Sequence, residues 1–263
     1  MLATHFQLRE EPFQKRIPEG GLYRSRAFEE GSKRLGHLLA AEGIGLLIGE
    51  TGCGKSTLLR EVERLADAGR TRVVYVSFTT LRSFGFLVHL GGVLGVQTRR
   101  FKGEMAKVLL EALSAAGRRT VLIVDEAHRL PDDTLEDLRL LTTANFDAAA
   151  PFTLLLSGQP LLKDRLDEPN ALALRQRITM RLALAPLSEA ETATYIEHRL
   201  RAAGGDPKIF DRSAIEAIFN ASRGVPRPIN ALATNAMLAA LGRGKRHVAA
   251  DCVQDAVVEM EHF

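Results

Sequence analysis

The chain has 263 residues, of which 46% are hydrophobic and 25% are charged, as in an ordinary globular protein of one large or two modest domains. This balance excludes wholesale disorder and fibrous repeats. No near-apolar stretch approaches the roughly 20 residues of a membrane span, and residues 1–9 carry no signal-peptide pattern. Two cysteines are too few for a disulfide framework, so we expect a cytoplasmic protein with reduced thiols. With a net charge of +3, any contact with nucleic acid must come from a local patch.

The first two thirds of the chain alternate strand and helix patterns. Residues 1–26 precede the first helix and are expected to form an extended arm. Strands are predicted at 44–48, 72–78, 120–124, 152–157 and 178–184, and helices at 55–68, 83–94, 101–116 and 132–145. Such alternation predicts a parallel sheet with helices on both faces.

The last third of the chain is predicted to be entirely helical. Ser188 and Glu191 have the spacing of a capping box, which marks the start of a helix. Helices are predicted at 188–203, 211–222, 226–241 and 249–260. We therefore expect three parts: an N-terminal arm at 1–26, an α/β core at 27–186 and a helical lid domain at 187–263.

A phosphate-binding loop is predicted between the first strand and the helix that follows it. Residues 49–56 match G-x-x-x-x-G-K-[ST], whose backbone amides surround a β-phosphate while the lysine pairs with the β- and γ-phosphates and the Ser hydroxyl binds Mg²⁺. A purely structural glycine-rich turn is the alternative, and the strand-loop-helix context argues against it. Cys53 is interpreted as a small variable position rather than a redox switch. The expected nucleotide-binding residues here are Gly49, Glu50, Thr51, Gly52, Cys53, Gly54, Lys55, Ser56 and Thr57.

Two adjacent carboxylates, Asp125 and Glu126, follow the buried strand at 120–124. Ligands bind at this edge of open α/β sheets. Asp125 is expected to accept hydrogen bonds from the hydration shell of Mg²⁺, and Glu126 to polarise the attacking water. An acidic helix N-cap is the alternative, which the nearby phosphate loop makes less favourable.

The loop, the Asp-Glu strand end and the helical last third together resemble an AAA+ ATPase over nearly the whole chain. The segment from His5 to Phe13, followed by Leu22 and Tyr23, resembles the amino-terminal signature of ExeA-type ATPases, with Gln7 in place of the usual glycine. The resemblance implies an AAA+ P-loop fold of five parallel strands between helices with a helical lid, and ATP hydrolysis with Mg²⁺ as cofactor.

The same resemblance implies further site residues. Residues 155–160 are similar to the family's fourth-strand ending, which implies a sensor role for Gln159, with Ser157 as second candidate. Arg177, with Arg175 second, matches the position of an arginine finger that reaches the nucleotide of a neighbouring subunit. Arg227 in Gly224-Val-Pro-Arg matches the second sensor of the lid. A solvated or helix-terminal role remains the alternative for Arg177 and Arg227.

The resemblance leaves two biological roles open. The chain is similar to ExeA-like, TniB- and TnsC-type transposition ATPases, which implies a self-associating, ATP-dependent regulator that binds double-stranded DNA and a transposase. ExeA-type secretion proteins continue into a membrane helix, and the end of the chain at Phe263 favours the DNA role over action on a secretion-system membrane protein. Thr98, Arg99, Arg100 and Lys102 are candidate DNA contacts; a solvated basic turn is the alternative.

His128 follows the Asp-Glu pair directly. Similarity to Asp-Glu-Ala-His runs implies a position beside the site, and helix packing is the alternative. The histidines elsewhere in the chain have no metal-ligand spacing.

Overall fold

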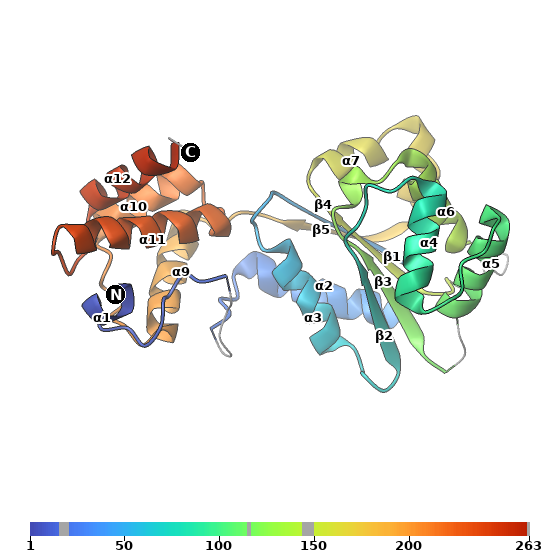
Figure 1. The fold of residues 1–263 in the computed structure, drawn as a ribbon, viewed down its shortest axis with the longest axis horizontal. Coiled ribbons are helices and arrows are strands. Elements are labelled where there is room, and N and C mark those ends of the chain that lie inside the picture. Colours follow the sequence, from blue (N-terminus) through green and yellow to red (C-terminus); the bar gives the residue numbers. More distant parts are fainter. Residues whose placement is uncertain (16–20, 115–116, 144–149, 262–263) are drawn as a thin grey trace. The chain divides into compact units, whose positions relative to one another are not determined.

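The computed structural model describes residues 1–15, 21–114, 117–143 and 150–261, which form two compact units (Figure 1). The sheet unit comprises Ala27–Thr51 and Lys55–Leu184. The helical unit comprises Met1–Arg26, Gly52–Gly54 and Ala185–Phe263. The N-terminal segment thus clusters with the C-terminal third of the chain.

The sheet unit is built on five strands that pair in parallel in the order β2-β3-β4-β1-β5. Between β1 and β2 the chain crosses to an edge of the sheet, and the later strands return until β5 lies on the other side of β1. The carboxyl ends of parallel strands at such a reversal form the usual ligand-binding crevice. The strand bounds are β1 Ile44–Gly49, β2 Thr71–Val76, β3 Arg119–Val124, β4 Thr153–Gly158 and β5 Ile178–Leu184.

Helices cover both faces of the sheet (Figure 1). Because crossovers between parallel strands are right-handed, the helix between β1 and β2 lies on one face and those between the later strands lie on the other. The first face carries α2 Arg26–Ala41 and α3 Lys55–Leu65. The second carries α4 Ser83–Leu94, α5 Lys102–Leu113, η1 Ala127–Arg129, α6 Asp132–Leu141, α7 Leu161–Leu166, η3 Pro169–Ala171 and α8 Leu172–Arg177.

The core of the sheet unit follows the two-residue alternation of its strands. Leu122 and Val124 of β3 are fully buried in one cluster with Phe86 of α4 and Met105 of α5. Ile123 is also buried but lies outside this cluster, as expected for a side chain on the opposite, α3-bearing face. Asp125, two residues later, continues on the face of Ile123, and its backbone N–H extends the ladder by donating to the carbonyl oxygen of Val76 at 2.8 Å.

The helical unit packs around α11. Its helices are α1 Leu2–His5, α9 Glu189–Ala202, α10 Arg212–Ser222, α11 Pro226–Gly242 and α12 Ala250–Glu261. The capping box is present: Ser188 Oγ accepts from the N–H of Glu191, and the Glu191 carboxylate accepts from the N–H of Ser188.

The N-terminal segment is not simply extended, contrary to expectation. It starts with α1, and its apolar side chains at Leu2, Phe6, Leu8 and Phe13 are buried in the core of the helical unit. Arg199 of α9, which is 4% exposed, donates to the carbonyl oxygens of Pro12 at 2.7 Å and Gln14 at 2.8 Å. These side chains are spaced irregularly, so no helical or strand period revealed their burial. Residues 16–20 of the predicted arm lie outside the described residues.

The five predicted strands and the main helices are present with boundaries shifted by a few residues. The predicted helices at 101–116 and 132–145 end at Leu113 and Leu141; positions 115–116 and 144–145 lie outside the described residues. Helices α7 and α8 were not predicted, because six residues are too few to establish a helical period. No helix in the described part of the chain is long and apolar enough to cross a membrane.

Candidate active site

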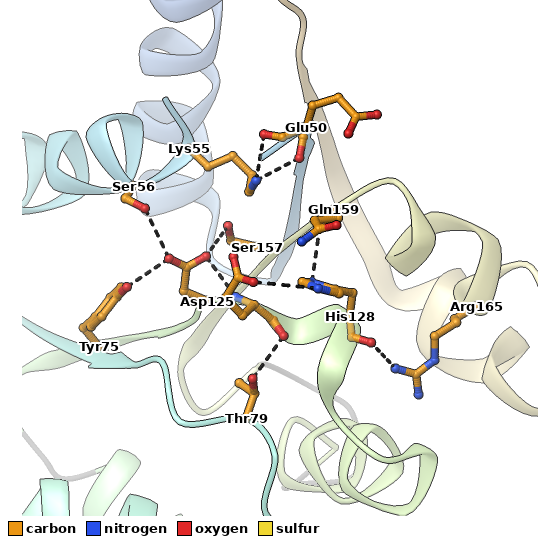
Figure 2. A network of polar contacts seen from close by, with 12 residues as sticks. Glu50, Lys55, Ser56, Tyr75, Thr79, Asp125, His128, Ser157, Gln159 and Arg165 are labelled. Atoms are coloured by element: carbon orange, nitrogen blue, oxygen red, sulfur yellow. Dashed lines mark hydrogen bonds and ion pairs between the residues drawn. The ribbon is translucent and has the colours of Figure 1, made fainter. Parts of the chain in front are cut away.

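The loop after β1 leads directly into α3. Gly52 and Gly54 adopt φ angles of 89° and 97°, which side chains other than glycine rarely tolerate. Lys55, the first residue of α3, is 6% exposed, and its Nζ donates to the carbonyl oxygens of Gly49 at 2.8 Å and Glu50 at 3.1 Å (Figure 2). A buried ammonium whose hydrogen-bond partners are neutral carbonyls favours an incoming anion. The helix N-terminus adds to this preference.

Asp125 accepts four hydrogen bonds at the carboxyl end of β3 (Figure 2). Its Oδ1 accepts from Ser157 Oγ at 2.8 Å and from the N–H of Glu126 at 2.9 Å. Its Oδ2 accepts from Tyr75 Oη at 2.9 Å and from Ser56 Oγ at 3.5 Å. Since a carboxylate has about four lone-pair positions, Asp125 is held in one orientation by four protein donors.

Ser56 and Asp125 are the residues that could hold a divalent cation. Their side-chain oxygens are 3.5 Å apart, and hydroxyl and carboxylate oxygens are the hard ligands that Mg²⁺ prefers. The described residues hold no group of three or more His, Cys, Asp and Glu side chains able to bind a metal. The hydroxyl and carboxylate oxygens of Ser56 and Asp125 fit Mg²⁺, which characteristically takes its other ligands from substrate phosphates and water.

Glu126 has an unusual backbone conformation. Its φ of 55° and ψ of 31° lie in the left-handed region, which a non-glycine residue adopts at a cost of about 1 kcal/mol. Three hydrogen bonds hold it there: Thr79 Oγ1 and the N–H of Arg129 donate to the carbonyl oxygen of Glu126 at 3.1 and 2.9 Å, and the N–H of Glu126 donates to Asp125. The Glu126 side chain is 39% exposed, so its carboxylate is open to water, whereas Asp125 is buried and accepts four hydrogen bonds.

His128 lies beside Glu126 rather than on the surface. It is 8% exposed, and its Nδ1 accepts from the backbone N–H of Gln159 at 3.4 Å. This contact assigns the proton of the neutral ring to Nε2, which is 3.7 Å from Glu126 Oε2. Burial lowers the pKa of His128 from its ordinary value, although the Glu126 carboxylate opposes the shift. The His128 ring thus contacts both the N–H of Gln159, which follows β4, and the Glu126 carboxylate.

Tyr75 and Thr79 were not predicted as site residues. Tyr75 lies on the edge strand β2 and its side chain is half-exposed. Burial raises the pKa of Tyr75 to about 12, and the hydrogen bond and negative charge of Asp125 act in the same direction, so the phenol remains a donor at neutral pH. Tyr75 and Thr79 lie about 50 positions before their partners Asp125 and Glu126, and the pairing of β2 with β3 brings them close. No local sequence pattern reveals such a contact.

Some of the predicted site residues lie together in the structure, and the predicted roles of others remain to be tested. Lys55, Ser56, Asp125, Glu126 and Gln159 meet at one edge of the sheet (Figure 2). Arg177 is the last residue of α8, and Arg227 lies in the first turn of α11 in the other unit. Their roles as finger and sensor remain predictions, as does the sensor role of Gln159.

The candidate DNA contacts lie in the connection between α4 and α5 and at the first residue of α5. Thr98, Arg99 and Arg100 are exposed, and the guanidinium of Arg100 lies 5.7 Å from the ring of Phe101. Lys102 differs from these, because its Nζ forms an ion pair with Asp137 Oδ1 at 2.8 Å. Lys102 therefore offers less charge to a phosphate than its sequence neighbours do.

These features define the AAA+ P-loop NTPase fold. They are a parallel sheet of this strand order, a glycine loop that leads into a helix, an Asp-Glu pair at the end of a strand, and a helical C-terminal region. Residues 39–166 match the family model described as "AAA domain". Among solved structures, Cdc6p from Pyrobaculum aerophilum aligns with a TM-score of 0.70 at 20% identity, over 98% of this chain and 70% of that one. The RuvB Holliday junction branch migration motor of Thermotoga maritima aligns with a TM-score of 0.61 at 19% identity, over 94% and 73% of the two chains.

A longer protein is also similar to this chain in sequence. The chain is 33% identical over 254 residues to General secretion pathway protein A of Aeromonas hydrophila. The match covers 94% of this chain but 46% of that relative, so the chain spans about half of the relative's length. This similarity agrees with the AAA+ P-loop fold of the chain.

Proposed function

We propose that the chain binds Mg-ATP and hydrolyses it to ADP and phosphate. The observation that carries this proposal is the convergence of a buried ammonium, a hydroxyl-carboxylate pair and a second, partly exposed carboxylate at one sheet edge. The choice of ATP over GTP rests on the family resemblance.

Each group has a distinct task. Lys55 and the loop amides bind the β- and γ-phosphates, and Ser56 and Asp125 hold Mg²⁺, the latter through water. Bound there, Mg²⁺ would neutralise charge on the phosphates. Glu126 orients and polarises the attacking water, a contribution of about 10²- to 10⁴-fold to the rate.

Calorimetric titration with ATP in Mg²⁺ tests the binding half of this proposal. Lys55→Ala should weaken binding by about 10²-fold, because a charge-assisted contact to phosphate is lost. Glu126→Gln should bind as tightly as the unmodified chain, since its role begins after binding. Glu259→Gln, an exposed position on α12, is the control for loss of one carboxylate. Equal binding by the Lys55 variant would contradict the assignment of the phosphate site.

Association into a ring or filament is part of the proposal. If Arg177 acts as an arginine finger, it completes the site of a neighbouring copy, and a dilute monomer hydrolyses ATP slowly. Specific activity should then rise with protein concentration, and Arg177→Ala should remove this rise. A specific activity independent of concentration would exclude an intermolecular finger.

For the biological role, the similarity to General secretion pathway protein A favours an ATPase that acts on a secretion or membrane-assembly partner from the cytoplasm. The 33% identity extends over 94% of this chain and so includes both units. Because that relative is about twice as long, its further parts and partners are not carried over.

A second role, a DNA-bound regulator of a transposase, is supported by the exposed basic segment Thr98–Arg100. Backbone phosphates are contacted by such groups without sequence preference, and binding weakens with salt. Arg99→Ala with Arg100→Ala should reduce ATP-dependent binding to duplex DNA. Arg201→Ala with Arg212→Ala removes the same charge from exposed sites on α9 and α10 and should not reduce it. Absence of DNA binding by the unmodified chain would leave the secretion-type role.

A further inference from the structure

Tyr75 and Asp125 are diagonal neighbours on one face of the sheet. Tyr75 is paired with Ile123 across β2 and β3, and Asp125 lies two residues beyond Ile123 on the same face. Diagonal neighbours in a sheet are about 7–8 Å apart at the backbone, a gap that an aromatic side chain spans. Tyr75 therefore reaches Asp125 from an edge strand without any distortion of the ladder.

The four hydrogen bonds on Asp125 are unequal. Ser157 and the N–H of Glu126 occupy Oδ1 at 2.8 and 2.9 Å, and Tyr75 occupies Oδ2 at 2.9 Å. Ser56 is the longest contact, at 3.5 Å to the same Oδ2. The Ser56 contact is thus the weakest of the four and the first to be exchanged for water, because 3.5 Å lies beyond the roughly 2.5–3.0 Å range of O–H···O hydrogen bonds.

We propose that Tyr75 is a positioning residue for the Mg²⁺ site, holding Oδ2 of Asp125 so that its remaining lone pair faces Ser56. Tyr75 fixes the rotation of the carboxylate, and the one exchangeable position of Oδ2 is directed at the hydroxyl that binds the cation. This role rests on the proposed binding of Mg-ATP. It adds a residue that neither the phosphate-loop pattern nor the Asp-Glu pair contains.

A merely structural role for Tyr75 predicts something different. Its ring is half-exposed, and Tyr75→Phe keeps that ring and removes only the hydroxyl. A packing role would therefore leave Mg²⁺ binding unchanged in Tyr75→Phe. A positioning role would raise the Mg²⁺ concentration that Tyr75→Phe requires. It would leave the binding of the nucleotide to Lys55 in the absence of Mg²⁺ unchanged.

The test uses the full chain and the imido analogue of ATP, which is not hydrolysed. Analogue affinity is first measured in EDTA, and Mg²⁺ is then titrated at saturating analogue with heat as the readout. Tyr75→Phe should raise the Mg²⁺ concentration at half-saturation about fivefold, since a hydrogen bond to a charged group is lost at a half-exposed site. Its analogue affinity in EDTA should equal that of the unmodified chain. Tyr23→Phe, which removes a hydroxyl bonded to Thr194 Oγ1 at 2.7 Å in the helical unit, is the matched control.

A double-mutant cycle with Asp125→Asn tests whether Tyr75 acts through Asp125. Tyr75→Phe should add no further rise in the Mg²⁺ requirement when Asp125 is already Asn. An unchanged Mg²⁺ requirement in Tyr75→Phe, or an equal loss with and without Mg²⁺, overturns the positioning role alone. If the unmodified chain binds the analogue without any dependence on Mg²⁺, the proposed function and this role fall together.

Discussion

Glu126 and His128 show how much of the site depends on the placement of single residues. Glu126 adopts a left-handed backbone conformation, and the Nε2 of the buried His128 lies 3.7 Å from its carboxylate. Two adjacent carboxylates consequently have different surroundings, one fully bonded and one available to water. Such a difference is what allows neighbouring acids to take different roles.

Because burial lowers the pKa of His128, folding should depend on pH through this residue. Between the lowered folded pKa and the unfolded value of about 6.5, the unfolded chain binds more protons, so stability rises with pH. The contribution is complete above about pH 6.5 and is lost as pH falls toward the folded pKa. His128→Gln should remove this pH dependence, which changes the unfolding free energy by at most about 1.4 kcal/mol per pH unit.

Urea unfolding of both proteins at pH 5, 6, 7 and 8 measures the effect. The difference in unfolding free energy between the unmodified chain and His128→Gln should change with pH below 6.5 and be constant above it. A constant difference throughout would mean that His128 is not buried in its neutral form.

At the scale of elements, the sequence predicted what local patterns encode. The five strands, the glycine loop and the capping box at Ser188 depend on residues within one element or one turn. Tyr75 could not be predicted, because its contact with Asp125 depends on the register of β2 against β3. The burial of Phe6 and Phe13 depends in the same way on packing against distant helices.

The turn between α10 and α11 requires glycine. Gly224 has a φ of 74°, and a Cβ added to it would be 1.9 Å from the carbonyl oxygen of Leu187. The N–H of Leu187 donates to the carbonyl oxygen of Gly224 at 2.9 Å, which holds the two backbones close together. Gly224→Ala should cost more than about 2 kcal/mol of unfolding free energy, because both the backbone angle and the contact are incompatible with a methyl group.

Gly242→Ala is the matched control for this prediction. Gly242 is the last residue of α11, and a Cβ added to it would meet open space. The substitution should be neutral or stabilise the helix by up to about 1 kcal/mol. Equal unfolding midpoints for the Gly224 and Gly242 variants in urea would show that the turn tolerates a side chain.

At the scale of the whole molecule, the N-terminal segment is part of the helical unit. Its apolar side chains share a core with α9 to α12, and Arg199 binds two of its backbone carbonyl oxygens. The first 15 residues therefore contribute to the stability of helices that follow more than 170 positions later.

Arg199→Ala should lower the unfolding free energy of the helical unit by about 2–4 kcal/mol, since the buried carbonyl oxygen of Pro12 and the partly buried one of Gln14 lose their donor. Arg201→Ala, two positions along the same helix, removes an exposed ion pair with Glu197 at 2.8 Å and should cost under about 0.5 kcal/mol. Thermal unfolding of both variants, followed by circular dichroism, gives the comparison. A similar loss in both would contradict the anchoring of the N-terminal segment by Arg199.

The central claim is that this sheet edge hydrolyses ATP through Glu126. The most direct measurement is phosphate release from ATP in excess Mg²⁺, with the unmodified chain and Glu126→Gln at the same concentration, each with and without duplex DNA. We predict Mg²⁺-dependent release by the unmodified chain and a rate at least about 10²-fold lower for Glu126→Gln in both conditions. Equal rates for the two proteins would contradict the claim.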